Sequence, residues 1–231
     1  MRRVINKLWC SAVALLLSAS PQLQAQVFDS EHYRISVVTV AERLDQPWGL
    51  AFLPDGDFLV TELSGGLKRV TPDGQHVSIT GLPPIQKHGQ GGLLDVVLDP
   101  DFANNRRIYL TYSGFGGNGI GTDALRGELV DDRLTNASII FRMRPKSGGG
   151  RHFGSRMAWL EDGSLLISLG DRGKRARAQR LDDHIGTIVR INPDGEVPRD
   201  NPFVGRADAL PEIYSYGHRN VQGMVRDPVT G

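Results

Sequence analysis

The sequence has a single cysteine among its 231 residues and a formal net charge of only +1. One cysteine, Cys10, forms no disulfide within the chain, and no cluster of Cys and His has the spacing of a zinc site. Because the charges nearly cancel, the chain lacks the basic excess typical of proteins that bind nucleic acid or an anionic membrane. We therefore expect stability to come from an apolar core or from bound ions.

Long apolar runs are also missing, apart from one near the N-terminus. There, the basic stretch MRRVINK is followed by the apolar stretch LWCSAVALLLSA and then by a cleavage point after Ala25. This order is typical of a secretory signal peptide, and the apolar run is too short to span a bilayer comfortably. The sequence predicts removal of residues 1–25, with Cys10 among them, and a periplasmic or secreted protein without a membrane span.

Helical periodicity is nearly absent, and a strand–turn–strand pattern recurs in its place. The pattern fills residues 49–63, 94–113 and 156–171 and begins a fourth time at Gly223. Asp-Gly supplies the positive φ that tight hairpin turns need. Two hairpins in each repeat of this kind predict the blades of an all-β propeller. The turn aspartates are Asp55, Asp101, Asp162 and Asp227.

The last residues stop within the turn of the fourth repeat. Residues 26–231 are thus predicted to form one propeller domain that is truncated at its C-terminal side, with roughly three and a half blades. An open ring exposes unpaired backbone groups, so we expect the sequence to be the N-terminal part of a longer protein. A natural short chain with a frayed tail is the alternative. The segment KRARAQRLDD (174–183) is expected to form a short helix in a loop.

Polar residues gather in the loops beside these strands. Gln90 lies among glycines, where backbone can approach a ligand closely and an amide offers both a donor and an acceptor. His152 follows three glycines, and Asp171 follows the next strand of the same hairpin. Antiparallel pairing is expected to bring imidazole and carboxylate together, as a general base requires. Taken singly, each residue also fits a plain loop or turn.

Arg219 and Asn220 lie between two glycines just before the fourth repeat. A planar cation suits a carboxylate or a developing oxyanion, although a surface arginine in a turn is the simpler interpretation. Equivalent loops of successive blades converge on one face of a propeller. We therefore expect these two residues to join Gln90, His152 and Asp171 in a single site.

Other common chemistries find no support in the sequence. No glycine loop that cradles phosphate precedes a helix, so a nicotinamide or nucleotide site is not expected. Ser155 lacks the context of a nucleophile elbow.

Six motifs stand in order along the chain: LDQPWGLAFLPDG, HGQGGLLDVVLDPDF, HFGSRM, GDRG, DGEVPRDNPF and IYSYGHRNVQG. Over about residues 35–231 the chain resembles the soluble quinoprotein sugar dehydrogenases, the glucose/sorbosone dehydrogenase family, and in particular its periplasmic aldose sugar dehydrogenases. The resemblance implies a six-bladed β-propeller that binds pyrroloquinoline quinone (PQQ) and calcium. It also implies an aldose substrate and a separate electron acceptor, which the sequence does not identify.

The resemblance assigns roles residue by residue. His152 matches the catalytic base, Asp171 the carboxylate that orients it, and Gln90 a glutamine that contacts the cofactor. Arg219 and Asn220 match the pair at the reactive carbonyl of the quinone. The implied reaction is base-assisted hydride transfer from C1 of the sugar to the quinone, which gives a lactone, with Arg219 stabilising the negative charge on the quinone oxygen.

The chain departs from the family pattern at three positions. Arg151 replaces a small or amide residue, Val221 replaces a proline, and Thr187 stands where the family tends to have a lysine that could contact a cofactor carboxylate. The family's calcium motif lies beyond the end of this chain, so no metal ligand is assigned. We also expect residues 26–231 alone to show no turnover.

Two other functions stay open. One is a propeller that binds a partner or a sugar without catalysis, and the other is a calcium-dependent hydrolase of the lactonase type. A hydrolase of that type is expected to line the axis with acidic metal ligands, whereas this chain places His, Gln, Arg and Asn there.

Overall fold

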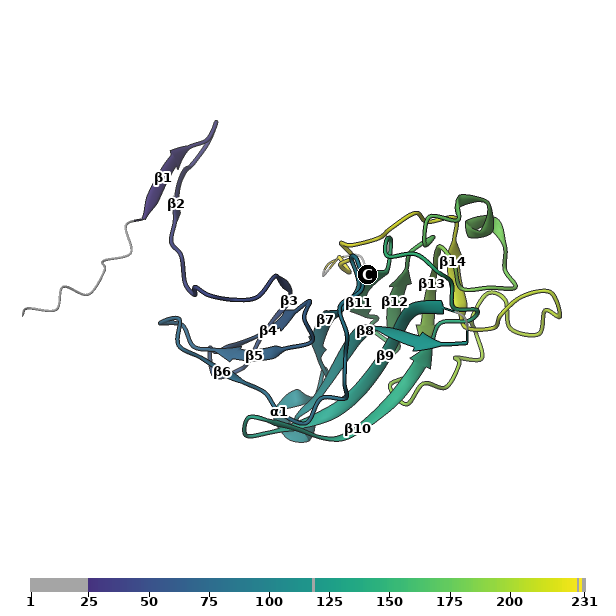
Figure 1. Cartoon of the computed structure of the whole chain (residues 1–231), viewed down its shortest axis with the longest axis horizontal. Coiled ribbons are helices and arrows are strands. Elements are labelled where there is room, and N and C mark those ends of the chain that lie inside the picture. Colours follow the sequence, from purple (N-terminus) through teal and green to yellow (C-terminus); the bar gives the residue numbers. More distant parts are fainter. Residues whose placement is uncertain (1–24, 118, 228, 230–231) are drawn as a thin grey trace, which may run out of the picture. The chain divides into compact units, whose positions relative to one another are not determined.

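Figure 1 shows the computed structural model of the chain, which describes residues 25–117, 119–227 and 229. Cys10 and all of the predicted signal peptide except Ala25 lie outside the described residues. The chain divides into two compact units between Thr39 and Val40, and each is described by itself. The smaller unit contains an antiparallel hairpin of β1 (Gln26–Asp29) and β2 (Arg34–Val37).

The larger unit consists of three four-stranded antiparallel sheets, each with its strands in chain order. The first sheet contains β3 (Pro47–Phe52), β4 (Phe58–Glu62), β5 (Leu67–Val70) and β6 (His76–Ser78). The second contains β7 (Leu93–Leu98), β8 (Arg107–Gly116), β9 (Gly119–Val130) and β10 (Arg133–Arg142). The third contains β11 (Gly154–Trp159), β12 (Leu165–Leu169), β13 (Thr187–Ile191) and β14 (Ile213–Tyr216). The prediction of an all-β fold built from repeated hairpins is confirmed.

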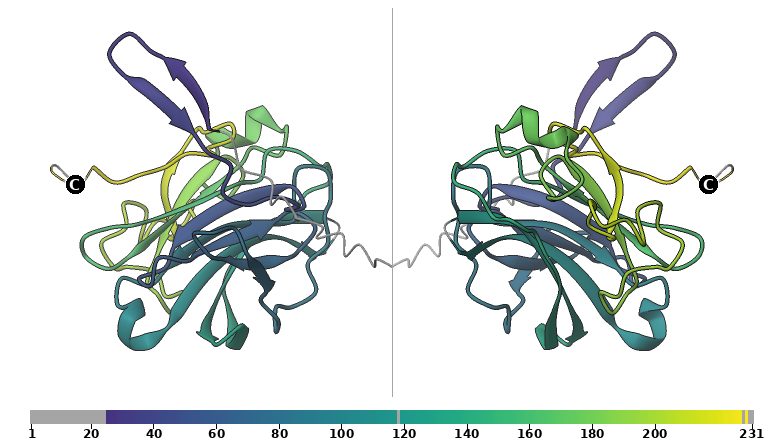
Figure 2. Two further views of the ribbon diagram at one scale, coloured as in Figure 1. Left: turned by 90° about the vertical axis from the view of Figure 1, so that its left-hand side faces the viewer. Right: turned by 90° about the vertical axis from the view of Figure 1, so that its right-hand side faces the viewer.

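Helices are short and few in the described part of the chain. They are α1 (Phe102–Asn105), in the turn between β7 and β8, and the 3₁₀ helix η1 (Arg175–Gln179). The expected loop helix is therefore present but shorter than residues 174–183. It lies beside the segment that follows β14 (Figure 2), where the Gly217 N–H donates to the Ala178 carbonyl at 2.8 Å. That segment, residues 217–227, forms no strand.

The three sheets meet along their first strands. β7 contacts both β3 and β11, and Figure 1 shows these strands side by side while the sheets fan away from them. Apolar residues of β8 explain why the sheets stack, because they alternate between two cores. Ile108, Leu110 and Tyr112 pack toward the first sheet, and Tyr109 packs toward the third. A strand buried on both faces in this way is typical of a propeller blade between two neighbours.

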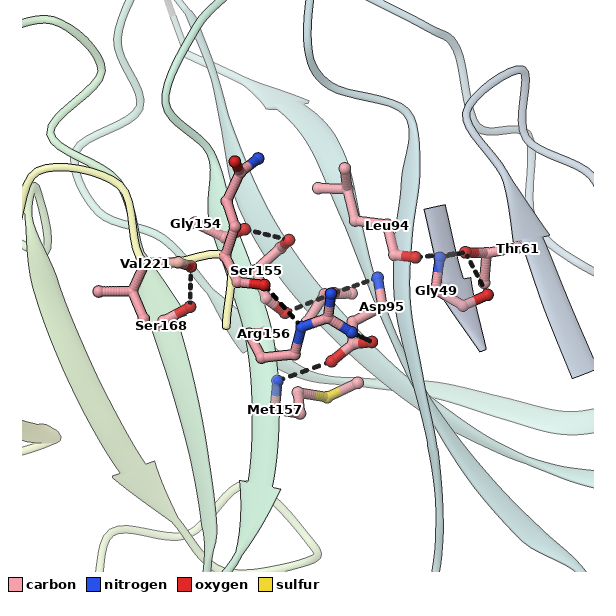
Figure 3. Close-up of polar contacts among 12 residues, drawn as sticks. Gly49, Thr61, Leu94, Asp95, Gly154, Ser155, Arg156, Met157, Ser168 and Val221 are labelled. Carbon is pink, nitrogen blue, oxygen red and sulfur yellow. Dashed lines mark hydrogen bonds and ion pairs between the residues drawn. The ribbon is translucent and has the colours of Figure 1, made fainter. Parts of the chain in front are cut away.

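The second strand of each sheet carries a buried hydroxyl. This hydroxyl donates a hydrogen bond to the segment that begins the next sequence repeat. Thr111 in β8 donates a hydrogen bond to the Ser155 carbonyl in β11 and accepts one from the Asp95 N–H, both at 2.9 Å. Asp95 lies where the β7–β8 register shifts, and such a bulge frees backbone groups that then need partners. The equivalent donor–acceptor pairs are Thr61–Leu94 (Figure 3), Thr111–Ser155 and Ser168–Val221 (Figure 3).

One guanidinium contacts all three first strands. Arg156 in β11 donates to Asp95 in β7 at 2.7 Å, and it lies 4.6 Å from the ring centroid of Trp48 in β3. The other oxygen of Asp95 accepts the Met157 N–H at 2.8 Å (Figure 3). Burial raises the pKa of Asp95, and the charge of Arg156 opposes that shift. Arg156 thus ties together the first strands of the three sheets.

Replacing Thr111 by valine is expected to lower the free energy of unfolding by about 2–4 kcal/mol, because the isosteric side chain leaves the buried Asp95 N–H and Ser155 carbonyl without their partner. Urea unfolding of the intact protein measures this loss. Thr111→Ser keeps the hydroxyl and serves as the control. Equal stability of the valine variant and the wild type would show that the hydroxyl does not join the sheets.

Candidate functional site

His152 lies just before β11, and Asp171 lies just after β12. Their side chains meet, with 2.6 Å between His152 Nδ1 and Asp171 Oδ1, and they are only 12% and 6% exposed. Because a carboxylate only accepts hydrogen bonds, Nδ1 carries a proton, and in the neutral imidazole Nε2 keeps its lone pair. Nε2 has no hydrogen-bond partner among the described residues. The arrangement is that of an oriented imidazole with a free basic nitrogen.

Backbone close approach explains how the two side chains come together. Gly154 pairs with Leu169 at the end of the hairpin, which brings the chain before β11 against the chain after β12. Gly170 has no side chain, and a Cβ there would lie 1.8 Å from the His152 carbonyl oxygen. Any other residue at this position would displace the His152 backbone. His152 itself has a φ of 55°, a strained conformation of the kind that accumulates at functional sites.

The other three predicted residues surround the same loop. The side-chain oxygen of Gln90 accepts the His152 N–H at 2.8 Å, and that of Asn220 accepts the Gly154 N–H at 3.0 Å. The Arg219 carbonyl accepts the Asp171 N–H at 2.8 Å. The structure therefore brings together all five residues that the sequence singled out. Arg219 and His152 line one pocket of about 460 Å³.

Arg172 is a further residue of this site that the sequence analysis missed. Its side chain is buried, and its guanidinium donates to the carbonyls of Gly149 and Arg151, the residues that lead into His152. It also lies 3.5 Å from the ring centroid of Phe153. Burial lowers the pKa of Arg172 to about 10. No carboxylate hydrogen-bonds to this buried cation, so desolvation of its charge is poorly compensated. Its two hydrogen bonds hold the loop that carries the imidazole.

If His152 acts as a general base, Arg172→Met is expected to lower the kcat of that base-assisted reaction by about tenfold to a hundredfold, because a loop freed from its two hydrogen bonds misplaces His152. Arg172→Lys keeps a charge but loses the planar fork, and an intermediate kcat is expected. Both variants are assayed below their midpoints of thermal unfolding, so that loss of folded protein does not contribute. Wild-type kcat in both would contradict the positioning role.

The three departures from the family pattern differ in consequence. Thr187 is fully buried and its hydroxyl donates to the His184 carbonyl at 2.9 Å, so this side chain serves the core. Val221 contributes its carbonyl, the acceptor of the Ser168 hydroxyl, and any residue type supplies a carbonyl. Arg151 lines the pocket beside His152.

Within residues 25–117, 119–227 and 229, no group of three or more His, Cys, Asp and Glu side chains is arranged to hold a metal ion. In that part of the chain, no helix has both the length and the apolar content needed to cross a bilayer.

Comparison with known proteins assigns the chain to a family. The profile described as Glucose / Sorbosone dehydrogenase matches residues 44–231. The aldose sugar dehydrogenase YliI of Escherichia coli (strain K12) is 45% identical over 199 residues, which cover 84% of this chain and 54% of that protein. The chain therefore spans about half the length of the curated relatives it matches.

Solved structures agree with the sequence comparison. The crystal structure of the soluble aldose sugar dehydrogenase from Escherichia coli in the apo-form has a TM-score of 0.80 at 40% identity, covering 90% of this chain and 58% of that one. The PQQ-bound form of the aldose sugar dehydrogenase from Streptomyces coelicolor has a TM-score of 0.73 at 32% identity, covering 90% and 59%. The chain belongs to the glucose/sorbosone dehydrogenase family.

Proposed function

We propose that the protein oxidises aldose sugars at C1 to the lactone, with PQQ as the cofactor. The observation that carries this proposal is the His152–Asp171 pair, which offers a free imidazole Nε2 in a pocket. Oxidation of an alcohol needs a base for the hydroxyl proton, and an imidazole oriented by a carboxylate is suited to that task near neutral pH.

The residues around the pair fit a quinone cofactor. Gln90 and Asn220 use their amide oxygens to accept backbone N–H groups, so each turns an NH₂ group, without a partner among the described residues, to the surroundings. The guanidinium of Arg219 likewise forms no ion pair with a described residue. These three donors suit the carbonyl and carboxylate oxygens of PQQ. When bound, PQQ supplies the two-electron acceptor of the reaction.

In this proposal each side chain has one role. His152 Nε2 takes the proton from the anomeric hydroxyl of the aldose, and Asp171 holds the ring and stabilises the imidazolium that results. Arg219, Gln90 and Asn220 bind the cofactor. Gly173 and Gly217 line the same pocket and add no side chain to it.

Further parts of the proposal rest on the family and on the N-terminal sequence. The resemblance to the family implies a six-bladed propeller and calcium as a second cofactor. No described residue is assigned as a calcium ligand. The N-terminal pattern supports a periplasmic or secreted location.

Reduction of an artificial electron-acceptor dye tests the proposal. The intact protein is purified without cofactor and supplied with PQQ and calcium, and several aldoses are then added. The proposal predicts dye reduction that requires both PQQ and an aldose. Absence of aldose-dependent reduction in protein that binds PQQ would contradict it.

A further inference from the structure

The pocket beside His152 has a marked excess of positive charge. Its walls carry the guanidinium groups of Arg151, Arg175 and Arg219. Asp171 is the one carboxylate among the residues that line it, and it is already engaged. Its Oδ1 contacts the His152 ring at 2.6 Å and accepts the Gly173 N–H at 2.7 Å.

None of the three guanidinium groups forms an ion pair or a hydrogen bond with a described residue. Two other arginines on the loop of Arg175, between β12 and β13, do form ion pairs. Arg177 donates to Asp183 at 2.9 Å, and Arg180 pairs with Asp182. The loop thus supplies carboxylates for Arg177 and Arg180, which do not line the pocket, and none for Arg175, which begins η1.

Arg151 is exposed, and both its backbone and its side chain lie against the loop after β12. Its carbonyl accepts a hydrogen bond from the buried Arg172, which fixes its backbone. Its side chain crosses to the loop after β12, where a Cβ on Gly173 would lie 2.7 Å from Arg151 Nε. The absence of a side chain at Gly173 therefore leaves room for this guanidinium in the pocket that Asp171 also lines.

The proposed oxidation of a neutral aldose uses only one of these cations, Arg219. An unpaired guanidinium offers a planar fork that matches a carboxylate or a phosphate, whereas sugar hydroxyls need no positive charge. We propose that Arg151 and Arg175 form an anion subsite, and that the preferred substrate is an aldose that carries a carboxylate or phosphate away from C1. This inference rests on the proposed function, and it names the substrate class.

Substrate comparison with the intact, PQQ-loaded protein tests the subsite. The ratio kcat/KM is measured for glucose, glucuronate and glucose 6-phosphate, so that the two anionic arms separate carboxylate from phosphate. We expect about a tenfold preference for one anionic sugar over glucose, which added NaCl reduces. In Arg151→Gln and Arg175→Gln the preference is expected to fall by about the same factor. Arg180→Gln, which removes a surface cation already paired with Asp182, is the matched control and should keep it.

Three outcomes would overturn the inference. In the first, kcat/KM for glucose equals that for both anionic sugars. In the second, the preference for an anionic sugar survives in Arg151→Gln and Arg175→Gln. In the third outcome, the same variants lose affinity for PQQ and keep the preference, which would mean that the arginines bind the carboxylates of the cofactor.

Calorimetric titration with glucuronate and with glucose 6-phosphate tests the subsite without turnover. Weaker binding of the preferred anion to Arg151→Gln than to wild type is expected even if no aldose is oxidised. Failure of oxidation alone would therefore count against the proposed function, and equal binding by the variant and the wild type would count against the subsite.

Discussion

Replacing His152 by alanine is expected to lower kcat for aldose oxidation by about 10²–10⁴-fold, the range that a positioned general base contributes. The reason is the free Nε2, which is the only nitrogen of this imidazole not engaged by Asp171. Binding of PQQ should persist, because Gln90, Arg219 and Asn220 remain in place. The measurements are the steady-state kcat and the absorbance of the quinone on the protein.

His76→Ala is the matched control, because His76 lies in β6, the last strand of the first sheet, and does not line the pocket. Its kcat should equal that of the wild type. Loss of quinone absorbance in His152→Ala would instead indicate that the imidazole holds the cofactor. A kcat near the wild-type value would remove His152 from the reaction altogether.

Replacing Asp171 by asparagine is expected to lower kcat by about a hundredfold or more. Asparagine keeps an oxygen that can accept the Gly173 N–H and the His152 ring, so the geometry of the loop is largely preserved. The negative charge is lost, and with it the stabilisation of the imidazolium that forms when the proton is taken. The effect should appear in kcat rather than in the affinity for PQQ.

Asp182→Asn provides the control for Asp171→Asn, since this carboxylate is half-exposed and pairs with Arg180 on the same loop. Asp171→Ala removes orientation as well as charge and should be at least as impaired as Asp171→Asn. Full activity of both Asp171 variants would contradict the assignment of Asp171 as the partner of the base.

Much of the fold follows from local patterns in the sequence. The recurring turn aspartates and their apolar flanks predict the hairpins around Asp55, Asp101 and Asp162, and the structure contains all three. The convergence of the predicted site also follows. Gln90, His152 and the Arg219–Asn220 pair precede the first strand of successive sequence repeats, and Asp171 follows the second strand of the His152 hairpin. The alternation of apolar residues along each strand and the order of the strands in the chain predict both the hairpins and the convergence, without knowledge of any long-range contact.

Other features depend on contacts between distant residues and leave no local pattern. Arg172 follows Asp171 in what reads as a polar turn, and only the structure shows its guanidinium buried against Phe153. Thr111 has the β propensity of any threonine in a strand, and its bond to Ser155 requires the neighbouring sheet. The same is true of Thr187, whose burial could not be read from the pattern GTIVRI.

The central claim is oxidation at C1 with the quinone as acceptor, and product analysis tests it most directly. The intact protein with PQQ and calcium is incubated with glucose labelled with deuterium at C1, and the sugar product is identified by mass spectrometry. The account predicts a lactone, or the acid formed from it by hydrolysis, that has lost the C1 deuterium and that forms only when PQQ is present. Unchanged sugar from protein that has bound PQQ, or a product that keeps the C1 deuterium, would contradict the account.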